Sequence, residues 1–194
     1  MYIPAVLAIA AAGINLTRRV WVVNAAALGL QYLGVFVLLC TVRPVSLAVV
    51  KLLVGWMVTL TLFLSLITDG KIRGAKAFFS FSAGEIFRLL AGLFAVLFTA
   101  VLLPELQAEV FPRSSLPLLL AAFSLLLLGL LQASLISEPF YVIIGLLTFL
   151  LGVELLYASL ELSILLEALF AGVNLGLALV GAFFVIKDAE IPEA

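Results

Sequence analysis

Four ionisable side chains lie within or beside long apolar stretches of the sequence: Lys51, Glu154, Glu161 and Glu167. Placing such a side chain in hydrocarbon costs at least about 2.5–3.5 kcal/mol, so a sequence that keeps one there uses it for packing or for chemistry. A carboxyl group shielded from water can hold a proton and pass it to a neighbour, which a proton relay requires. These residue types therefore point to proton or cation movement.

Glu154 has the deepest predicted position of the four. It stands in FLLGVELLYASL, with apolar residues for several helical turns on each side. That depth is hard to explain by a side chain that reaches back to the headgroups. Two readings stay open: a proton-relay carboxyl, or a protonated glutamate that makes one hydrogen bond to a neighbouring helix.

Three further polar residues follow at helical spacing. Glu161 comes two turns after Glu154, so it either shares that face or lies in a solvated turn between the last two helices. Glu167 is about one turn into the final apolar run, and Asn174 follows seven residues later on the same face. An asparagine can relay a proton through water but cannot itself carry the charge. Functional and structural readings of Glu167 both remain open.

Lys51 stands about a turn and a half inside the run that follows Arg43-Pro44. Its long stem either reaches the headgroups or is buried, with the amine paired to a carboxylate from another helix. Asn24 and Gln31 are weaker polar candidates, expected to form hydrogen bonds between helices. Small residues in the final run, Ala171, Gly172, Gly176 and Gly181, predict a close helix approach.

The overall composition excludes a soluble monomer. Apolar residues make up 66% of the 194 residues and charged residues 11%, against about 45–50% and about 25% in soluble domains. The mean hydropathy is +1.38. We therefore predict an all-α, polytopic integral membrane protein, 1–194 being one transmembrane domain of about seven helices. The expected spans are 2–16, 20–42, 46–68, 86–104, 115–136, 139–158 and 162–186, followed by a short acidic tail at 187–194.

The basic residues set the expected orientation. With the N-terminus outside and the C-terminus cytoplasmic, seven basic residues fall on the cytoplasmic side, two on the other side, and Lys51 inside a span. The cytoplasmic set is Arg18, Arg19, Lys71, Arg73, Lys76, Arg88 and Lys187; the other set is Arg43 and Arg113. The segment from Asp69 to Glu85 is expected to lie at the headgroups, as a simple basic loop or as a docking surface.

The sequence lacks the residues that several kinds of site would require. Histidine is absent and Cys40 is the single cysteine, which excludes imidazole or two-thiolate metal sites, Cys–His nucleophiles and disulfides. No nucleotide-binding loop, zinc motif or nucleophile elbow is present in the sequence. We expect no cofactor, no metal, no nucleic-acid partner and no catalytic site in this chain.

The last three expected helices resemble a known family. GVELL at 152–156 and GLAL at 176–179 are similar to motifs of the K-type subunit of complex I and the C subunit of multisubunit cation/proton antiporters. The resemblance implies a three-helix core at 115–186 preceded by four helices at 1–104. It also implies that Glu154 takes the place of the family's proton-path glutamate. Gly172 occupies the place of a second family glutamate, with Asn174 nearby.

The length and VVKLLVGWMVTL at 49–60 are more similar to the hydrogenase-4 component E family of group 4 membrane-bound hydrogenases. This resemblance implies roles for Lys51, Glu167 and Asn174 in a proton path. It also implies antiporter-like membrane subunits as partners and a prokaryotic cytoplasmic membrane as the location. The alternatives are a scaffold or accessory subunit without an ion path, and a small-solute transporter.

Overall fold

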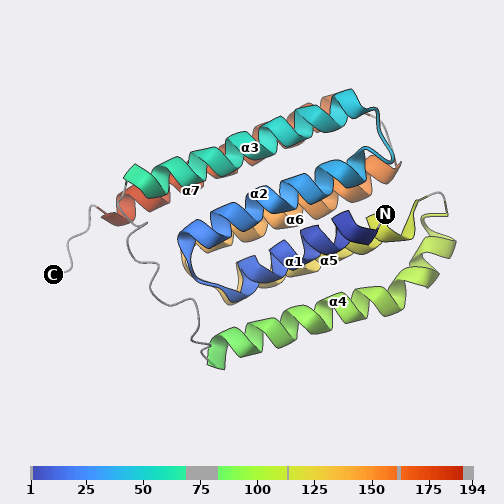
Figure 1. Cartoon of the computed structure of the whole chain (residues 1–194), viewed down its shortest axis with the longest axis horizontal. Helices are drawn as coiled ribbons and strands as arrows, with labels where there is room; N and C mark the ends of the chain where they lie inside the picture. The colour runs from blue at the N-terminus through green and yellow to red at the C-terminus, as the bar shows by residue number, and fades with distance from the viewer. Residues whose placement is uncertain (1, 69–82, 113, 161–162, 190–194) are drawn as a thin grey trace.

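The computed structural model describes residues 2–68, 83–112, 114–160 and 163–189. Within these residues every regular element is an α-helix (Figure 1). The helices are α1 (Tyr2–Thr17), α2 (Trp21–Leu39), α3 (Val45–Thr68), α4 (Ala83–Glu109), α5 (Leu116–Leu135), α6 (Pro139–Leu160) and α7 (Ile164–Ala189). The predicted all-α fold is confirmed.

Six of the helices, α2 to α7, are long and apolar enough to cross a membrane. The first helix is also apolar but has only 16 residues, which extend about 24 Å. A hydrocarbon core is about 30 Å thick, so α1 alone falls short of a full crossing. The chain is therefore an integral membrane protein by the length and composition of six helices.

The helices form two layers with one further helix at the side (Figure 1). In the front layer α3, α2 and α1 lie next to one another, and behind them lie α7, α6 and α5. The stacked pairs α3 with α7, α2 with α6 and α1 with α5 are all in contact. On the far edge, α4 packs against α5 and α1. One consequence is a ring of four helices, α2, α3, α6 and α7, separated from α4.

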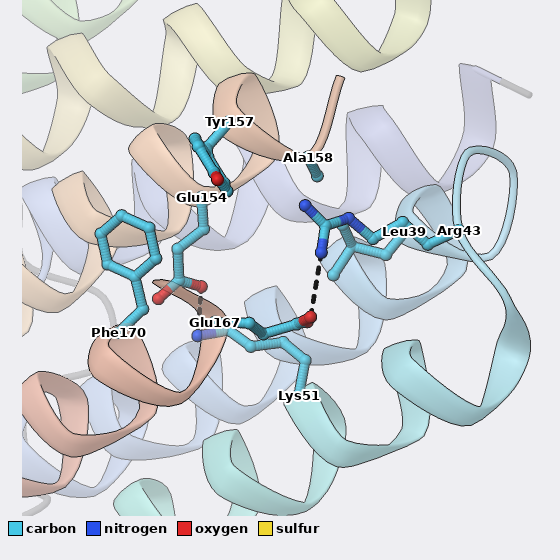
Figure 2. A pocket seen from close by; sticks show the side chains of 8 residues that line it. All are labelled: Leu39, Arg43, Lys51, Glu154, Tyr157, Ala158, Glu167 and Phe170. Carbon is cyan, nitrogen blue, oxygen red and sulfur yellow. Dashed lines mark hydrogen bonds and ion pairs between the residues drawn. The ribbon is translucent and has the colours of Figure 1, made fainter. Parts of the chain in front are cut away.

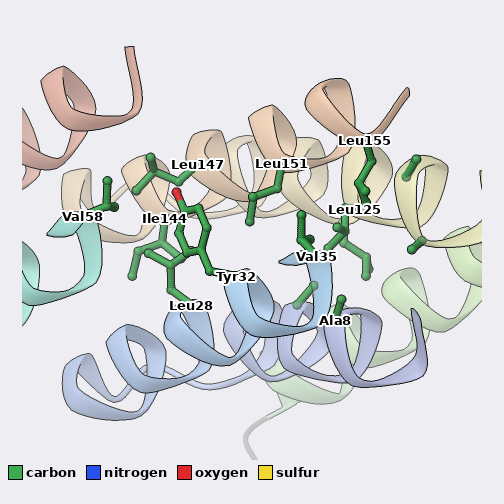
Figure 3. Packing of buried hydrophobic residues seen from close by; sticks show 14 of the residues in the cluster. Ala8, Leu28, Tyr32, Val35, Val58, Leu125, Ile144, Leu147, Leu151 and Leu155 are labelled. Carbon is green, nitrogen blue, oxygen red and sulfur yellow. The ribbon is translucent and has the colours of Figure 1, made fainter. Parts of the chain in front are cut away.

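Aliphatic side chains from both layers fill the space between them (Figure 3). Leu28 and Val35 of α2 meet Ile144, Leu147 and Leu151 of α6, and all five are fully buried. Hydrocarbon outside the protein is as apolar as this core, so close packing of side chains replaces the hydrophobic effect as the source of cohesion.

Glycines bring α5 and α6 into backbone contact. A Cβ added to Gly129 would come 2.4 Å from the backbone nitrogen of Phe149, and one added to Gly145 would come 2.9 Å from the carbonyl oxygen of Gly129. The predicted close approach of α7 occurs at Gly181 but not at Gly172 or Gly176, which have no described atom within 4 Å of such a Cβ. Those two glycines lie on the outward face of α7.

Three predicted C-terminal helix ends differ from the structure by three residues or more. The second span was expected to end at 42, but α2 ends at Leu39 and a turn follows it. The fourth span was expected to end at Pro104, yet α4 continues to Glu109. Proline removes one hydrogen bond and crowds the preceding turn, so it bends a helix without always ending it. The ribbon of α4 turns near this end in Figure 1. The predicted acidic tail is shorter than expected, because α7 includes Lys187 to Ala189.

Candidate functional site

The candidate site is an ion pair between Lys51 of α3 and Glu154 of α6, inside the ring of four helices (Figure 2). The two residues are 5% and 7% exposed, respectively. Of the two readings left open for Lys51, the structure has the buried, paired one. Because α3 and α6 lie in different layers, the long lysine stem is what lets the amine reach the carboxylate.

Asn174 holds the other oxygen of the same carboxylate. Its Nδ2 donates a 2.6 Å hydrogen bond to Oε1 of Glu154 and a 2.8 Å bond to the backbone oxygen of Phe170, one turn earlier in α7. The hydroxyl of Tyr32 donates to Oδ1 of Asn174 at 3.4 Å. The amine of Lys51 lies 5.5 Å from the centre of the Tyr32 ring, within cation–π range.

Each helix of the ring thus contributes one side chain to a central cluster: Tyr32, Lys51, Glu154 and Asn174. Tyr32 is 1% exposed and Asn174 is fully buried. The ring of Tyr32 lies across Gly55 of α3, where an added Cβ would be only 2.1 Å from its Cδ1. A glycine at position 55 is therefore what makes room for the tyrosine beside Lys51.

A second ion pair lies toward the end of the ring. Arg43, in the connection between α2 and α3, donates from Nη1 to Oε2 of Glu167 at 2.9 Å. Their side chains are 3% and 17% exposed. Glu167 belongs to the first turn of α7, two turns or about 10.5 Å along the axis from Asn174. The guanidinium also lies 5.9 Å from the centre of the Tyr157 ring.

A small cavity separates the two ion pairs (Figure 2). Its volume is about 20 Å³. Charged side chains of both pairs line it, together with the apolar or aromatic residues Leu39, Tyr157, Ala158 and Phe170. A cavity needs about 10–15 Å³ of such volume to hold a water molecule, so there is room for one. One water there would lie between the Arg43–Glu167 pair and the Lys51–Glu154 pair.

The structure brings together four of the five residues singled out from the sequence, Lys51, Glu154, Glu167 and Asn174. Glu161, the fifth, lies outside the described residues, and α6 ends just before it at Leu160. Glu167 and Asn174 line the same side of α7, as their spacing predicted.

Arg43 and Tyr32 were not predicted as site residues. For Arg43 a signal existed, since the basic-residue count placed it on the same side of the membrane as the start of the final helix. Tyr32 stands in an apolar run without any such signal.

The weaker polar candidates form the expected hydrogen bonds between helices. Oε1 of Gln31 accepts a 3.0 Å bond from the Thr148 hydroxyl, and Nδ2 of Asn24 donates a 3.0 Å bond to the backbone oxygen of Asn15. Both bonds join buried groups of α2 to a neighbouring helix. Both lie outside the small cavity: the Gln31–Thr148 bond joins the two layers, and the Asn24–Asn15 bond joins α2 to α1 within the front layer.

No group of three metal-binding side chains occurs among the described residues. No protein-family model, curated protein or solved structure matches the chain. The chemistry open to the site therefore follows from its own groups: a carboxylate and an amine in contact can exchange a proton, and a water in the cavity can extend that exchange toward Glu167.

Proposed function

We propose that the protein is a noncatalytic membrane subunit of a complex I-like, group 4 hydrogenase-like or antiporter-like assembly, and that it supplies part of a path for protons or cations. The observation that carries the proposal is the buried Lys51–Glu154 pair, with the Arg43–Glu167 pair across a water-sized cavity. Neighbouring membrane subunits would continue the path on either side.

Stability alone is a weak reason for such a pair. Replacing a buried ion pair by apolar side chains of similar size is often neutral or stabilising, because two charges must leave water to form it. The cost is larger inside a bilayer, where ionisable residues most often mark ion pathways and proton relays. Four charged groups around one small cavity therefore favour a functional role over a structural one.

The groups suggest an order of steps. A proton taken from the end of the bundle reaches Glu167, crosses the cavity through one water and protonates Glu154. Loss of the carboxylate charge weakens the hold on Lys51, which can then pass a proton onward. Asn174 positions the carboxylate and cannot carry the charge. Glu161 remains a candidate from the sequence.

The same proposal includes seven spans, an outside N-terminus, a cytoplasmic C-terminus and a prokaryotic cytoplasmic membrane. Two ion pairs support the proposed alternation of the helix ends between the two sides of the membrane. Arg19 pairs with Glu138 at 3.2 Å, and both stand in connections expected on the cytoplasmic side. Arg43 and Glu167 were both expected at the other side. A full crossing by α1 requires a locally thinner bilayer.

The test starts from the tagged protein purified in a gentle detergent from its native membranes. Mass spectrometry identifies the chains that co-purify, and proton pumping is measured after reconstitution for the unaltered complex and for Glu154→Gln. The matched control is Glu138→Gln, which removes a half-exposed carboxylate just before the first residue of α6.

We expect redox or antiporter-like subunits to co-purify, with assembly intact in both variants and pumping lowered only in Glu154→Gln. If the complex assembles and pumps normally with Glu154→Gln, the chain is a scaffold or accessory subunit. If the chain purifies alone, a small-solute transporter becomes the better account.

A further inference from the structure

Arg88 is a buried arginine that takes no part in the proposed path. It stands in α4, five residues or about 7.5 Å from the first residue of the helix, and is 6% exposed. No described residue accepts a hydrogen bond from its Nε or Nη1. A buried guanidinium normally has its donors satisfied, because leaving them unpaired costs free energy. These two nitrogens therefore lack an acceptor among the described residues, and the cavities beside Arg88 are where a ligand could meet its guanidinium.

Two cavities meet at Arg88. One, of about 320 Å³, lies at the end of the bundle and is lined by Arg19, Gly84, Glu85, Phe87, Arg88 and Leu135. The other, of about 190 Å³, is a groove between α1, α4 and α5, where Arg88 is the only charged residue among the described residues of the lining. Its remaining lining is Ile9, Gly13, Leu16, Thr17, Leu89, Gly92, Leu93, Val96 and Leu128. The groove runs along the helices, away from the bundle end.

We propose that these two cavities form a binding site for one anionic phospholipid. The phosphate accepts hydrogen bonds from the guanidinium of Arg88, which lines the outer cavity, and an acyl chain lies in the apolar groove beside α4. A guanidinium presents donors in a planar fork that suits two oxygens of a phosphate. Basic pockets between membrane helices bind anionic headgroups by this chemistry.

Arg88 is the basic side chain of the outer cavity that is available to a ligand. Among the described residues, the charged ones that line this cavity are Arg19, Arg88 and Glu85. Arg19 already pairs with Glu138 and is about half exposed, so Arg88 supplies the main contact.

The groove separates a lipid from a free anion. A free phosphate would use only the outer cavity and would leave the groove beside α4 without a role. Both cavities lie on the side of α4 that faces α1 and α5, and these three helices span or line the bilayer. A chain of methylene groups next to a bound phosphate is what a phospholipid places there.

The test measures lipid bound to the full chain in detergent by native mass spectrometry and by the rise in melting temperature. Phosphatidylglycerol, phosphatidylcholine and inorganic phosphate are added separately. Arg88→Gln removes the fork of donors. Gly13→Leu fills the groove, because a Cβ at Gly13 meets no described atom within 4 Å, and leucine suits a helix better than glycine. This second variant leaves every charge in place.

Two matched controls accompany these variants. Lys187→Gln removes an exposed basic residue at the same predicted side of the membrane but outside both cavities. Gly176→Leu introduces the same side chain as Gly13→Leu at an open position on α7. A change in lipid binding that also appears in the controls would come from general effects of charge or size.

We expect phosphatidylglycerol to bind more tightly than phosphatidylcholine, and its affinity to fall at least about tenfold in Arg88→Gln, as for a lost hydrogen bond between charged groups. Gly13→Leu should weaken phosphatidylglycerol as well, and both controls should bind like the unaltered chain. Equal binding of the two lipids, or unchanged affinity in both variants, overturns the proposal. Full competition by inorganic phosphate with no effect of Gly13→Leu also overturns it, since the site then takes a free anion.

Discussion

Asn174 donates its shortest hydrogen bond, 2.6 Å, to the carboxylate of Glu154, twenty residues earlier in the chain. The same amide group also bonds to the backbone of its own helix, so it is held from one side while it holds the carboxylate from the other. Lys51 occupies the second carboxylate oxygen. The position of the charge in the centre of the ring is therefore set by α7 as much as by α6.

Replacing Asn174 by leucine should loosen this arrangement. The Glu154 carboxylate then loses a donor, and hydrogen bonds to charged groups contribute about 1.5–3 kcal/mol. Tyr32→Phe is the matched control, because it removes only the 3.4 Å bond on the far side of the amide and keeps the ring beside Lys51. Thermal unfolding in one detergent should show a large loss for Asn174→Leu and a small loss for Tyr32→Phe. Equal losses would contradict a special role for the bond to Glu154.

Removing one member of the Lys51–Glu154 pair should destabilise the protein more than removing both. Lys51→Met leaves a buried carboxylate without its cation, and breaking a buried pair in this way costs about 3–5 kcal/mol. The double variant Lys51→Met with Glu154→Leu removes both charges and should recover most of that loss in the same unfolding assay. Proton pumping by the assembled complex should stay low in both variants. Recovery of pumping in the double variant would show that neither charge belongs to the path.

The helices were largely predictable because charges, prolines and glycines interrupt otherwise continuous apolar runs. The predicted ends at 68, 136 and 158 agree with the structure to within two residues, since Asp69, Glu138 and Glu161 mark them. The predicted end at Pro104 was wrong because a proline removes one backbone hydrogen bond and can bend a helix without ending it. The residues after Pro104 continue α4 to Glu109.

The site was predictable as a set of residues but not as a set of pairs. The free-energy cost of burying a charge indicated Lys51 and Glu154 separately. Their pairing depends on which helices form the ring of α2, α3, α6 and α7. Arg43 was counted only as a loop charge, although its partner Glu167 was expected at the same side. The close helix contact predicted from glycine spacing was wrong at Gly172 and Gly176. They have the spacing of a helix contact but lie on an outward face of α7.

Replacing a glycine at the contact of α5 with α6 should therefore change stability in the opposite direction from replacing an outward-facing glycine of α7. Gly129→Ala places a methyl group against the backbone of α6, 2.4 Å from the nitrogen of Phe149, so the helices must separate. Overpacking of this kind costs about 1–3 kcal/mol. Gly176→Ala has open space and should gain about 0.5–1 kcal/mol from the better helix propensity of alanine. Melting temperatures that fall equally in both variants would contradict this assignment of the two glycine sets.

The two resolved ion pairs at opposite ends of the bundle should respond differently to salt. Arg43–Glu167 has side chains 3% and 17% exposed, whereas Arg19–Glu138 has side chains 46% and 49% exposed. Exposed pairs contribute about 0.2–1 kcal/mol, and 1 M salt shortens the screening length to about 3 Å. Double-mutant cycles with Arg→Gln and Glu→Gln in each pair should give a coupling above about 1 kcal/mol for Arg43–Glu167 that persists in 1 M salt. The coupling of Arg19–Glu138 should be smaller and should vanish there. Equal couplings with equal salt dependence would mean that Arg43–Glu167 is as hydrated as Arg19–Glu138. The cavity between Arg43–Glu167 and Lys51–Glu154 would then be open to bulk water.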